Sequence, residues 1–407
     1  MRVLILNQAF HPDVVSSAQH ASDLARKLAA RGFEVTVLAS SHGYDDPRVR
    51  FPVRERWCGV EIRRVRHTNL GKGSKWRRAA DFASFYIACT WRLMWIGSFD
   101  AVIAMTSPPL ISFLSAVFAK LRRGKLFLWM MDLNPDEAIA AGWIQPKSFL
   151  TRVLERSLRY SFESSELIVV LDRFMRDRVL AHSGGSKVAI VPPWTHDSAV
   201  HYDAEGRLGF RREHGLEGKF VVMYSGNHSP CHPLTTLLEA ALALAEHTDI
   251  AFCFIGGGSE FAGIKSFVFE HGLENVLCLP YQPLANLSSS LSAADLHVVA
   301  MGNSFVGIVH PCKVYNILKL GIPFLYIGPP ESHVTDMVPR EGAGWARLSQ
   351  HGETGRVVSQ ILEAKETGPK RYEQEVGLSN SYSEDELTQI MFGFVKDSMN
   401  TSSQGLR

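Results

Sequence analysis

The sequence predicts an α/β fold made of two doubly wound, parallel-sheet domains. Its 407 residues exceed what one hydrophobic core usually serves, so two domains are expected. Short apolar runs typical of buried strands alternate with amphipathic segments typical of helices, and this alternation implies parallel strands with helices on both faces. The alternation breaks once, at Pro192-Pro193-Trp194 and the polar stretch that follows. We therefore place an interdomain linker at residues 193–215.

The first domain, residues 1–192, opens with a β-α-β unit. Val3–Leu6 reads as a buried strand, residues 18–30 as an amphipathic helix, and Glu34–Ala39 as the next strand. Further strands are expected at Val60–Val65, Ala101–Met105, Leu126–Met131, Leu167–Leu171 and Val188–Val191. The first loop holds no glycine, which argues against a nicotinamide dehydrogenase with its glycine-rich phosphate loop.

The second domain, residues 216–380, repeats the alternation. Its strands are expected at Phe220–Ser225, Ile250–Ile255, Val276–Leu279, Leu296–Ala300 and Pro323–Ile327, with helices at 234–246, 261–271, 284–293 and 311–321. Two Rossmann-like sheets in tandem predict a cleft that faces the carboxyl ends of their strands. Residues 381–407 read as a C-terminal helix and polar tail, and we expect residues 383–396 to pack back towards the first domain.

A basic run precedes an aromatic helix in the first domain. The formal charge of +2 excludes a wholesale nucleic-acid binder, but nine cations gather between residues 54 and 78: Arg54, Arg56, Arg63, Arg64, Arg66, Lys72, Lys75, Arg77 and Arg78. The helix at 79–96 has an uncharged core about half as long as the roughly 20 residues of a membrane span. Two interpretations stay open. The helix covers the sheet, or it lies in a membrane interface while the cations of 54–78 meet anionic headgroups. We favour the second, peripheral role.

The cysteines and the amino terminus predict a cytoplasmic protein. Six cysteines are scattered without a C-x-x-C pair or metal-ligand spacing, which fits a reducing compartment and predicts no metal site. Met1 leads directly into a strand and leaves no room for a signal peptide. Together with the basic run, this predicts a protein held at the inner face of the plasma membrane.

The stretch from Gly307 to Pro323 has the features of a phosphate site. A turn at Gly307 leads to a proline near a helix start, then Lys313, then apolar residues up to Gly321. Free N–H groups in the first turn, the positive end of the helix dipole and one ammonium suit a phosphate group. A capped helix that packs on a sheet explains the segment alone equally well.

Four stretches of the sequence together resemble the retaining GT-B glycosyltransferases (family 4-like), in particular the branch that builds cell-surface polysaccharides on lipid carriers. They are residues 10–19 with 28–32, residues 131–137, residues 224–232 with 236–240, and the stretch from Gly307. The resemblance covers nearly the whole chain, and it rests on the order and spacing of the four stretches. It implies a GT-B architecture, a nucleotide-sugar donor of the UDP or GDP type, a polyprenyl-type lipid-linked acceptor, and neither cofactor nor metal.

The resemblance also implies where the donor binds. Where relatives have a Gly-Arg pair and a following lysine on the diphosphate, this chain has Gly226-Asn227 and His232. Where relatives have two glutamates near the donor sugar and ribose, it has Ile308 and Asn316. We expect the donor to bind through Ser16, Ser17, Gly226, Asn227, His228, Gln282, Gly307, Ile308, Val309, Lys313 and Asn316.

Three residues are candidates for catalysis. Lys313 suits charge that grows on the leaving phosphate, and His232 can donate a hydrogen bond without a full charge. Asp132 follows a strand at the cleft edge, where it orients the acceptor or caps the next helix; His11, in the first loop, is the other acceptor-binding candidate. In such families the leaving phosphate takes the acceptor proton, so no protein base is required.

Two other functions remain open at this point. A sugar-nucleotide 2-epimerase shares tandem sheets but acts on a soluble substrate and gives the aromatic helix no purpose. A non-catalytic scaffold that binds nucleotide sugar or membrane is consistent with the missing arginine, lysine and glutamate pairs.

Overall fold

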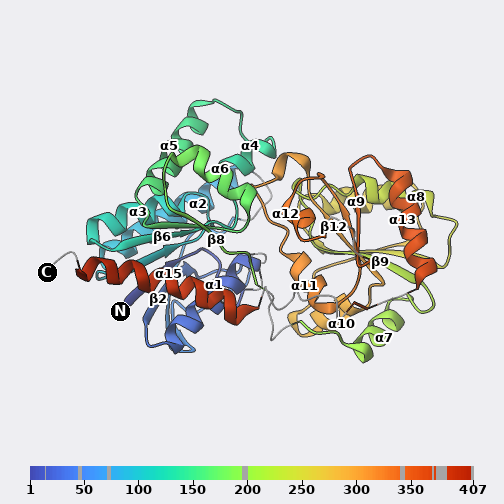
Figure 1. The fold of residues 1–407 in the computed structure, drawn as a ribbon, viewed down its shortest axis with the longest axis horizontal. Helices are drawn as coiled ribbons and strands as arrows, with labels where there is room; N and C mark the ends of the chain where they lie inside the picture. Colours follow the sequence, from blue (N-terminus) through green and yellow to red (C-terminus); the bar gives the residue numbers. More distant parts are fainter. Residues whose placement is uncertain are drawn as a thin grey trace. The chain divides into compact units, whose positions relative to one another are not determined.

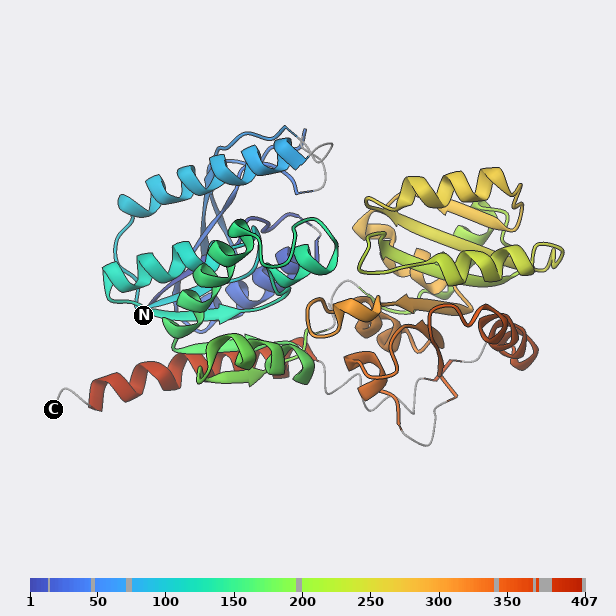
Figure 2. The same cartoon turned by 90° about the horizontal axis from the view of Figure 1, so that it is seen from above.

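A computed structural model describes residues 1–13, 15–44, 48–70, 75–194, 200–339, 344–368, 371–372 and 383–404. The chain forms two compact units, one of Met1–Pro193 with Asp385–Arg407 and one of Trp194–Glu384 (Figures 1 and 2). Each unit has its own parallel sheet and its own helices. The α/β fold of two parallel-sheet domains is therefore confirmed.

The first unit is built on an eight-stranded sheet in the order β3-β4-β2-β1-β5-β6-β7-β8. Its strands are β1 (Arg2–Leu6), β2 (Glu34–Ser40), β3 (Arg54–Trp57), β4 (Val60–Val65), β5 (Ala101–Ala104), β6 (Lys125–Trp129), β7 (Leu167–Val170) and β8 (Val188–Ile190). All pairs are parallel except β3 with β4. Every strand predicted for this domain is present. The edge strand β3 was not predicted, because it carries charged side chains on a short hairpin.

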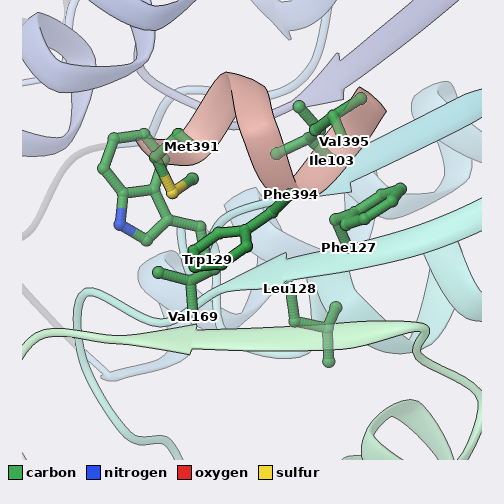
Figure 3. A pocket seen from close by; sticks show the side chains of 8 residues that line it. All are labelled: Ile103, Phe127, Leu128, Trp129, Val169, Met391, Phe394 and Val395. Atoms are coloured by element: carbon green, nitrogen blue, oxygen red, sulfur yellow. The ribbon is translucent and has the colours of Figure 1, made fainter. Parts of the chain in front are cut away.

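Helices join these strands, and the last helix of the chain returns to this unit. They are α1 (Ser16–Ala30), α2 (Lys75–Met94), α3 (Ile111–Arg122), α4 (Asp136–Ala140), α5 (Phe149–Glu163), α6 (Arg173–Ser183) and α15 (Glu384–Gln404). Figure 3 shows α15 on the sheet, where Met391, Phe394 and Val395 face Trp129 of β6 and Val169 of β7. The predicted docking of residues 383–396 on the first domain is confirmed. None of the described helices combines the length and apolarity that a membrane crossing requires.

Side chains in and just after α1 contact the first half of α15. Lys27 pairs with Asp385, and Arg31 lies 5.0 Å over the ring of Phe392. The same ring meets Phe33 edge-on at 5.4 Å between centroids. The carboxyl-terminal helix is thus attached by an ion pair, a cation–π contact and an aromatic pair.

The second unit is a six-stranded parallel sheet in the order β11-β10-β9-β12-β13-β14. Its strands are β9 (Phe220–Asn227), β10 (Ile250–Gly257), β11 (Val276–Leu279), β12 (Leu296–Ala300), β13 (Phe324–Ile327) and β14 (Ala346–Ser349). Its helices are α7 (Ala204–Glu213), α8 (Thr235–Ala243), α9 (Phe261–Glu270), α10 (Leu287–Ser292), α11 (Lys313–Leu320), α12 (His333–Asp336) and α13 (Thr354–Thr367), with 3-10 turns at Leu284–Asn286 and Asn303–Phe305. Buried apolar side chains cover both faces of this sheet.

Helix α7 lies inside the range 193–215, for which the sequence predicted a linker. Asp203 caps it by accepting a hydrogen bond from the Gly206 N–H. Arg207 and Arg211 of α7 each bind one carboxylate oxygen of Asp295 at 2.5 Å. Asp295, which is 3% exposed, also accepts from the Val221 N–H at 2.8 Å. The helix is therefore held by buried ion pairs rather than by an apolar stripe, and so it has little hydrophobic signature in the sequence.

We expect Asp295→Ala to lower the free energy of unfolding of the second unit by about 3 to 5 kcal/mol, because it leaves buried guanidinium groups without a counter-charge. Urea denaturation followed by circular dichroism measures the loss. The control is Glu217→Ala, which removes an exposed pair with Arg212 and should cost about 1 kcal/mol or less. Equal losses in the two variants would contradict the account of α7.

Candidate active site

The carboxyl ends of β9 and β10 are packed too closely for side chains. Gly226 pairs with Gly256 in the sheet, and a Cβ at Gly256 would lie 2.0 Å from the Gly226 carbonyl oxygen. Gly258 has φ +134°, and a Cβ there would lie 2.2 Å from the His228 carbonyl oxygen. Only glycine fits these positions. The tight packing leaves backbone, rather than side chains, at this edge of the sheet.

The ammonium group of Lys313 lies against this edge. Lys313 is the first residue of α11, and its Nζ lies 3.4 Å from the centre of the Tyr224 ring in β9. A Cβ at Gly226 would lie 2.9 Å from the same atom. The Nζ is buried and has no hydrogen-bond partner among the described residues. Burial lowers the pKa of Lys313 well below its usual range. An ammonium in this position lacks an anion, and a phosphate group would supply one.

Two histidines in the loop after β9 accompany Lys313. His228 is fully buried between the rings of Tyr224 and Phe261, and its backbone N–H donates to the Gly257 carbonyl at 2.8 Å. Burial, and then the charge of Lys313, lower the pKa of His228 to about 4. The same two causes lower the pKa of His232 to about 3, and its Nδ1 contacts the Ala300 carbonyl at 2.9 Å. Both imidazoles are therefore neutral at pH 7.

The turn before α11 has the shape that the sequence predicted, but its amides are used locally. Gly307 has φ +69° and Gly321 closes the helix at φ +67°. The N–H groups of Ile308 and Val309 both donate to the Phe305 carbonyl, at 3.0 and 3.2 Å. Their side chains are buried. The site's positive charge consequently comes from the Lys313 side chain more than from these two backbone groups.

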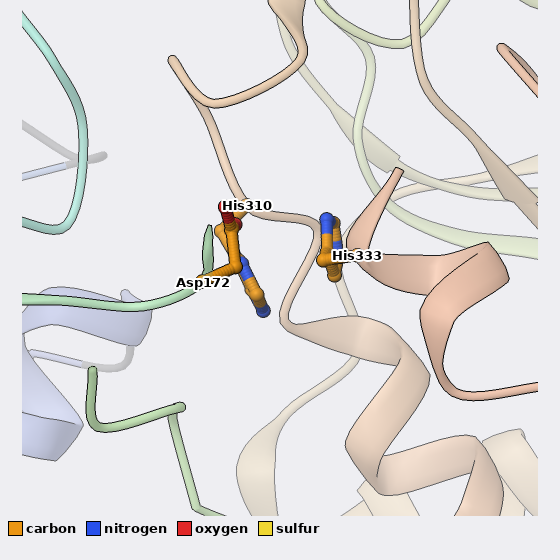
Figure 4. Close-up of side chains that lie close together, drawn as sticks. All are labelled: Asp172, His310 and His333. Atoms are coloured by element: carbon orange, nitrogen blue, oxygen red, sulfur yellow. The ribbon is translucent and has the colours of Figure 1, made fainter. Parts of the chain in front are cut away.

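The rest of this turn is fixed by an aromatic stack (Figure 4). The ring of His310 lies on that of His333 with centroids 3.6 Å apart, and His310 Nε2 contacts the Tyr315 hydroxyl at 2.7 Å. His310 immediately precedes Pro311, and Tyr315 belongs to the first turn of α11. The stack thus sets the direction in which α11 begins and in which Lys313 leaves the helix.

Three other predicted donor residues lie in the second unit. Asn316 is one turn after Lys313 on α11 and is partly exposed, so its amide can reach a ligand on the same helix face. Gln282 follows β11, is partly exposed, and donates from Nε2 to the Pro280 carbonyl at 3.1 Å. Asn227 is exposed at the end of β9. Their roles in donor binding remain predictions.

Asp132 is placed in the first unit, after β6, in an environment that favours its protonated form. Burial, and then the carboxylate of Glu137, raise the pKa of Asp132 to about 8. The helix that follows, α4, has Pro135 at its N-cap and no side-chain cap, so Asp132 does not cap it. A carboxyl group that stays protonated at pH 7 can donate a hydrogen bond to a hydroxyl group.

Ser16, Ser17 and His11 lie in and before the first turn of α1. The helix begins at Ser16, so both serines belong to it and not to the preceding loop. Ser16 Oγ contacts His20 Nδ1 at 3.3 Å. The His11 ring stacks on the Trp57 ring with centroids 4.2 Å apart. The backbone N–H of His11 donates to Ser22 Oγ, and its backbone carbonyl accepts from buried Arg64. These contacts give His11 a structural role in the first unit.

Sequence reasoning missed Tyr224, whose ring forms the floor beneath Lys313. The residue is fully buried, and its hydroxyl donates to the Asn227 carbonyl at 2.6 Å. Tyr281, after β11, donates from its hydroxyl to the Gly257 carbonyl at 3.3 Å. It thus borders the glycine edge, by which we mean Gly226, Gly256, Gly257 and Gly258 at the carboxyl ends of β9 and β10. An aromatic residue near a strand end is ordinary core sequence, so no signal marks either residue.

Residues 17–194 match the glycosyl transferase 4-like domain family. This match spans most of the first unit and indicates a glycosyl transferase 4-like domain there. The chain is 24% identical over 253 residues to WbjE of Pseudomonas aeruginosa, which is named as a glycosyltransferase; the match spans 60% of this chain and 62% of WbjE. It is 22% identical over 346 residues to WcaI of Escherichia coli K12, whose name refers to colanic acid biosynthesis; that match spans 79% of this chain and 82% of WcaI.

Solved structures show the same GT-B fold as this chain. Sucrose-phosphate synthase of Thermosynechococcus elongatus superposes with a TM-score of 0.75 at 13% identity, over 98% of this chain and 100% of that one. HepE of Anabaena, solved in complex with UDP, gives a TM-score of 0.68 at 13% identity over the same shares. At these identities the likeness concerns the fold.

The protein should lose stability when its buried histidines are protonated. His228, His232 and His297 have pKa values lowered to about 4, 3 and 4, against an ordinary 6.5, so the unfolded chain binds more protons between pH 6.5 and 4. Stability therefore falls as pH falls through this window. Each histidine that titrates contributes about 1.4 kcal/mol per pH unit.

The variant His297→Gln should show a smaller loss of stability between pH 7 and 5.5 than the parent protein, measured by urea denaturation at each pH. His271→Gln, at the exposed end of α9, is the control and should keep the parent's slope. If the His297→Gln slope equals the parent's, this histidine does not carry the effect.

Proposed function

We propose that this glycosyltransferase moves a hexosyl group from a nucleotide-sugar donor to a lipid-linked, polyprenyl-type acceptor in cell-surface polysaccharide synthesis, with retention and without a metal ion. The observation that carries the donor part is the buried, unpartnered Nζ of Lys313 beside the glycine edge of β9 and β10. HepE, which shares the fold, binds UDP and UDP-glucose. A UDP or GDP donor fits the same corner of the second unit, with its diphosphate at Lys313.

The proposed chemistry relies mainly on stabilising the leaving group. As the bond from the anomeric carbon to the phosphate breaks, negative charge grows on the diphosphate, and the ammonium of Lys313 offsets it. His232 lies close enough for Lys313 to lower its pKa. While neutral, it uses its single N–H on the Ala300 carbonyl, so it can donate to the diphosphate only after it takes up a proton. The side chains supply positive charge themselves, so no metal is needed. The acceptor hydroxyl gives its proton to the leaving phosphate, which removes the need for a protein base.

Asp132 is proposed to hold the acceptor or the transferred sugar. With a pKa raised to about 8, its carboxyl group is mostly protonated at pH 7 and can donate a hydrogen bond to a hydroxyl group. Such a group can orient a substrate hydroxyl without bringing a negative charge of its own. This is the positioning role that transfer without a protein base requires.

The membrane part of the proposal is supported by the outer face of α2. The helix buries Phe85, Cys89 and Leu93 in the first unit, so it covers the sheet. Its opposite face remains apolar and exposed. Ile87 is 72% exposed, Trp91 62% and Trp95, just past the helix end, 73%. Exposed tryptophans on an amphipathic helix are typical of a surface that enters a membrane interface.

Cations border this apolar face. The pKa of Arg92, on α2, is lowered by burial and then by Arg63 and Arg54, which places these guanidinium groups together. Arg122 of α3 donates to the Met94 carbonyl at 2.9 Å, beside the helix end. Of the basic run, Lys72 and the side chains of Lys75 and Arg78 lie outside the described residues. An apolar stripe bordered by cations complements an anionic lipid surface, where each cation contributes about 1 kcal/mol.

The two rival functions fit these observations less well. The glycosyl transferase 4-like match over 17–194 favours glycosyl transfer over 2-epimerisation. A scaffold that binds only membrane would have no need of the buried Lys313 amine, which costs stability unless a ligand uses it. A scaffold that also binds nucleotide sugar remains the second candidate, and turnover distinguishes it from the enzyme.

Donor binding is tested with a panel of UDP-, GDP- and dTDP-sugars. A true donor raises the melting temperature because it binds the folded state. For the donor that binds, we expect Lys313→Met to raise the dissociation constant by about tenfold or more, the loss of a charge-assisted hydrogen bond of about 1.5 to 3 kcal/mol. Lys319→Met, at the other end of α11, is the control and should leave the affinity unchanged. Equal affinity in the parent and in Lys313→Met would refute the donor site.

Membrane binding is tested by sedimentation with vesicles that contain anionic phosphatidylglycerol. We expect Trp91→Ala with Trp95→Ala to weaken binding by more than about tenfold, because each tryptophan loses its apolar contact with lipid. Arg54→Gln with Arg56→Gln should weaken binding to anionic vesicles only, about fivefold per cation. Phe269→Ala removes an 87% exposed aromatic side chain from α9 and is the control. A loss of binding in the control equal to that of the tryptophan variant would contradict a specific surface.

A further inference from the structure

The cluster around Lys313 can carry several positive charges, and no described carboxylate is among the groups that shift the pKa values of its members. Its three basic groups are the Lys313 amine and the imidazoles of His228 and His232. The Lys313 Nζ makes no hydrogen bond with any described residue. Neither ring nitrogen of His228 makes one of normal geometry, although the carbonyls of Gly226 and Gly257 lie close to the ring.

The groups that face the cluster are neutral or basic. Tyr224 of β9 lies beneath the ammonium, with Tyr281 and the thiol of Cys231 close to its hydroxyl. His297 of β12 is affected by the charge of Lys313 and also by Arg207. Among the described residues, no carboxylate is among the groups that shift the pKa of Lys313, His228 or His232. Each added proton is therefore opposed both by burial and by the other basic groups.

This arrangement differs from an ordinary anion site, in which a cation is kept charged by neighbouring acids or by water. Here the free protein stabilises the uncharged amine, because burial penalises the ammonium and nothing pairs with it. A diphosphate brings two or more negative charges into the same space. An opposite charge within about 4 to 6 Å raises the pKa of a basic group by about one to three units. The ligand and the proton thus favour each other's binding.

We propose that the Lys313–His228–His232 cluster acquires its charge from the ligand, so that a nucleoside diphosphate binds together with a proton taken from solution. The proposal rests on the proposed donor site at Lys313 and adds how that site is charged. The proton adds to the lone pair of the Lys313 amine, with His232 and His228 as further acceptors. No covalent bond changes, and the buffer supplies the proton. The nucleoside diphosphate product carries more negative charge than the donor, so it retains the proton more strongly.

Two measurable consequences follow. The affinity for a nucleoside diphosphate falls as pH rises between the pKa of Lys313 in the free protein and its pKa in the complex, by up to tenfold per pH unit. Outside that window the affinity levels off. Product release becomes easier at higher pH, so the inhibition constant of the product should rise with pH in parallel.

The test is isothermal titration calorimetry of the full chain with UDP and GDP between pH 7.5 and 9.5. In this range the terminal phosphate of the ligand is already ionised, since its last pKa is near 6. At each pH the titration is repeated in two phosphate-free buffers whose ionisation enthalpies differ, such as Bicine and Tris, and the difference in observed enthalpy gives the protons taken up. We expect a maximum uptake between about half a proton and one proton, and a dissociation constant that rises several-fold across the range.

Two variants identify the group that takes up the proton. Lys313→Met should abolish most of the uptake and flatten the pH dependence of the affinity that remains. Lys319→Met, on the same helix, should keep both. Uptake that persists undiminished in Lys313→Met would overturn the assignment of the proton to Lys313.

The outcomes also separate this inference from the donor proposal. Binding of UDP or GDP with no buffer dependence at any pH would overturn the inference and leave the donor site intact. Binding of inorganic pyrophosphate with proton uptake, but of neither nucleotide, would support the charging mechanism and contradict the donor class. Absence of binding for all three would overturn both.

Discussion

The contact between the Lys313 ammonium and the end of β9 governs the candidate site. The Nζ lies over the Tyr224 ring, and it is so close to Gly226 that a Cβ on that residue would lie 2.9 Å from it. An aromatic face attracts a cation but supplies no hydrogen bonds, so the three donors of an ammonium remain unused. Holding a cation there is costly unless a ligand pairs with it. The site is therefore built at the expense of stability, which is typical of positions that a substrate completes.

The neighbouring structure exists to make that contact possible. Gly226, Gly256 and Gly258 let β9, β10 and the following loop approach one another more closely than any Cβ permits. This closeness buries His228 and brings its N–H to the Gly257 carbonyl. On the other side, the stack of His310 on His333 fixes the start of α11. The side chain of Lys313 is thus confined between the glycine backbone of β9 and β10 and the fixed start of α11. These two neighbours set the direction in which it points.

The fold could be predicted from the sequence to a much greater extent than the site. Strands such as Val3–Leu6 and Leu296–Ala300 are buried on both faces, and continuous apolar runs reveal them. Elements held by charge were missed: β3 has charged residues on a hairpin, and α7 depends on Asp295, far away in the chain. The position of Lys313 was predicted from local signals, but its partner Tyr224 was not. A contact between distant residues leaves no local pattern when one partner looks like ordinary core.

The same geometry gives a physical reason for the sequence's departures from its relatives. The resemblance implies an arginine and a lysine where this chain has Asn227 and His232. Lys313 already lowers the pKa of His232, so a permanent cation at that position would be repelled in a buried space where no described carboxylate acts on it. Because α11 already places the basic group of Lys313 here, neutral residues at 227 and 232 destabilise the fold less than two further cations would. The loss of the usual cations is thus consistent with a donor site whose charge comes from another helix, and it does not by itself indicate a loss of activity.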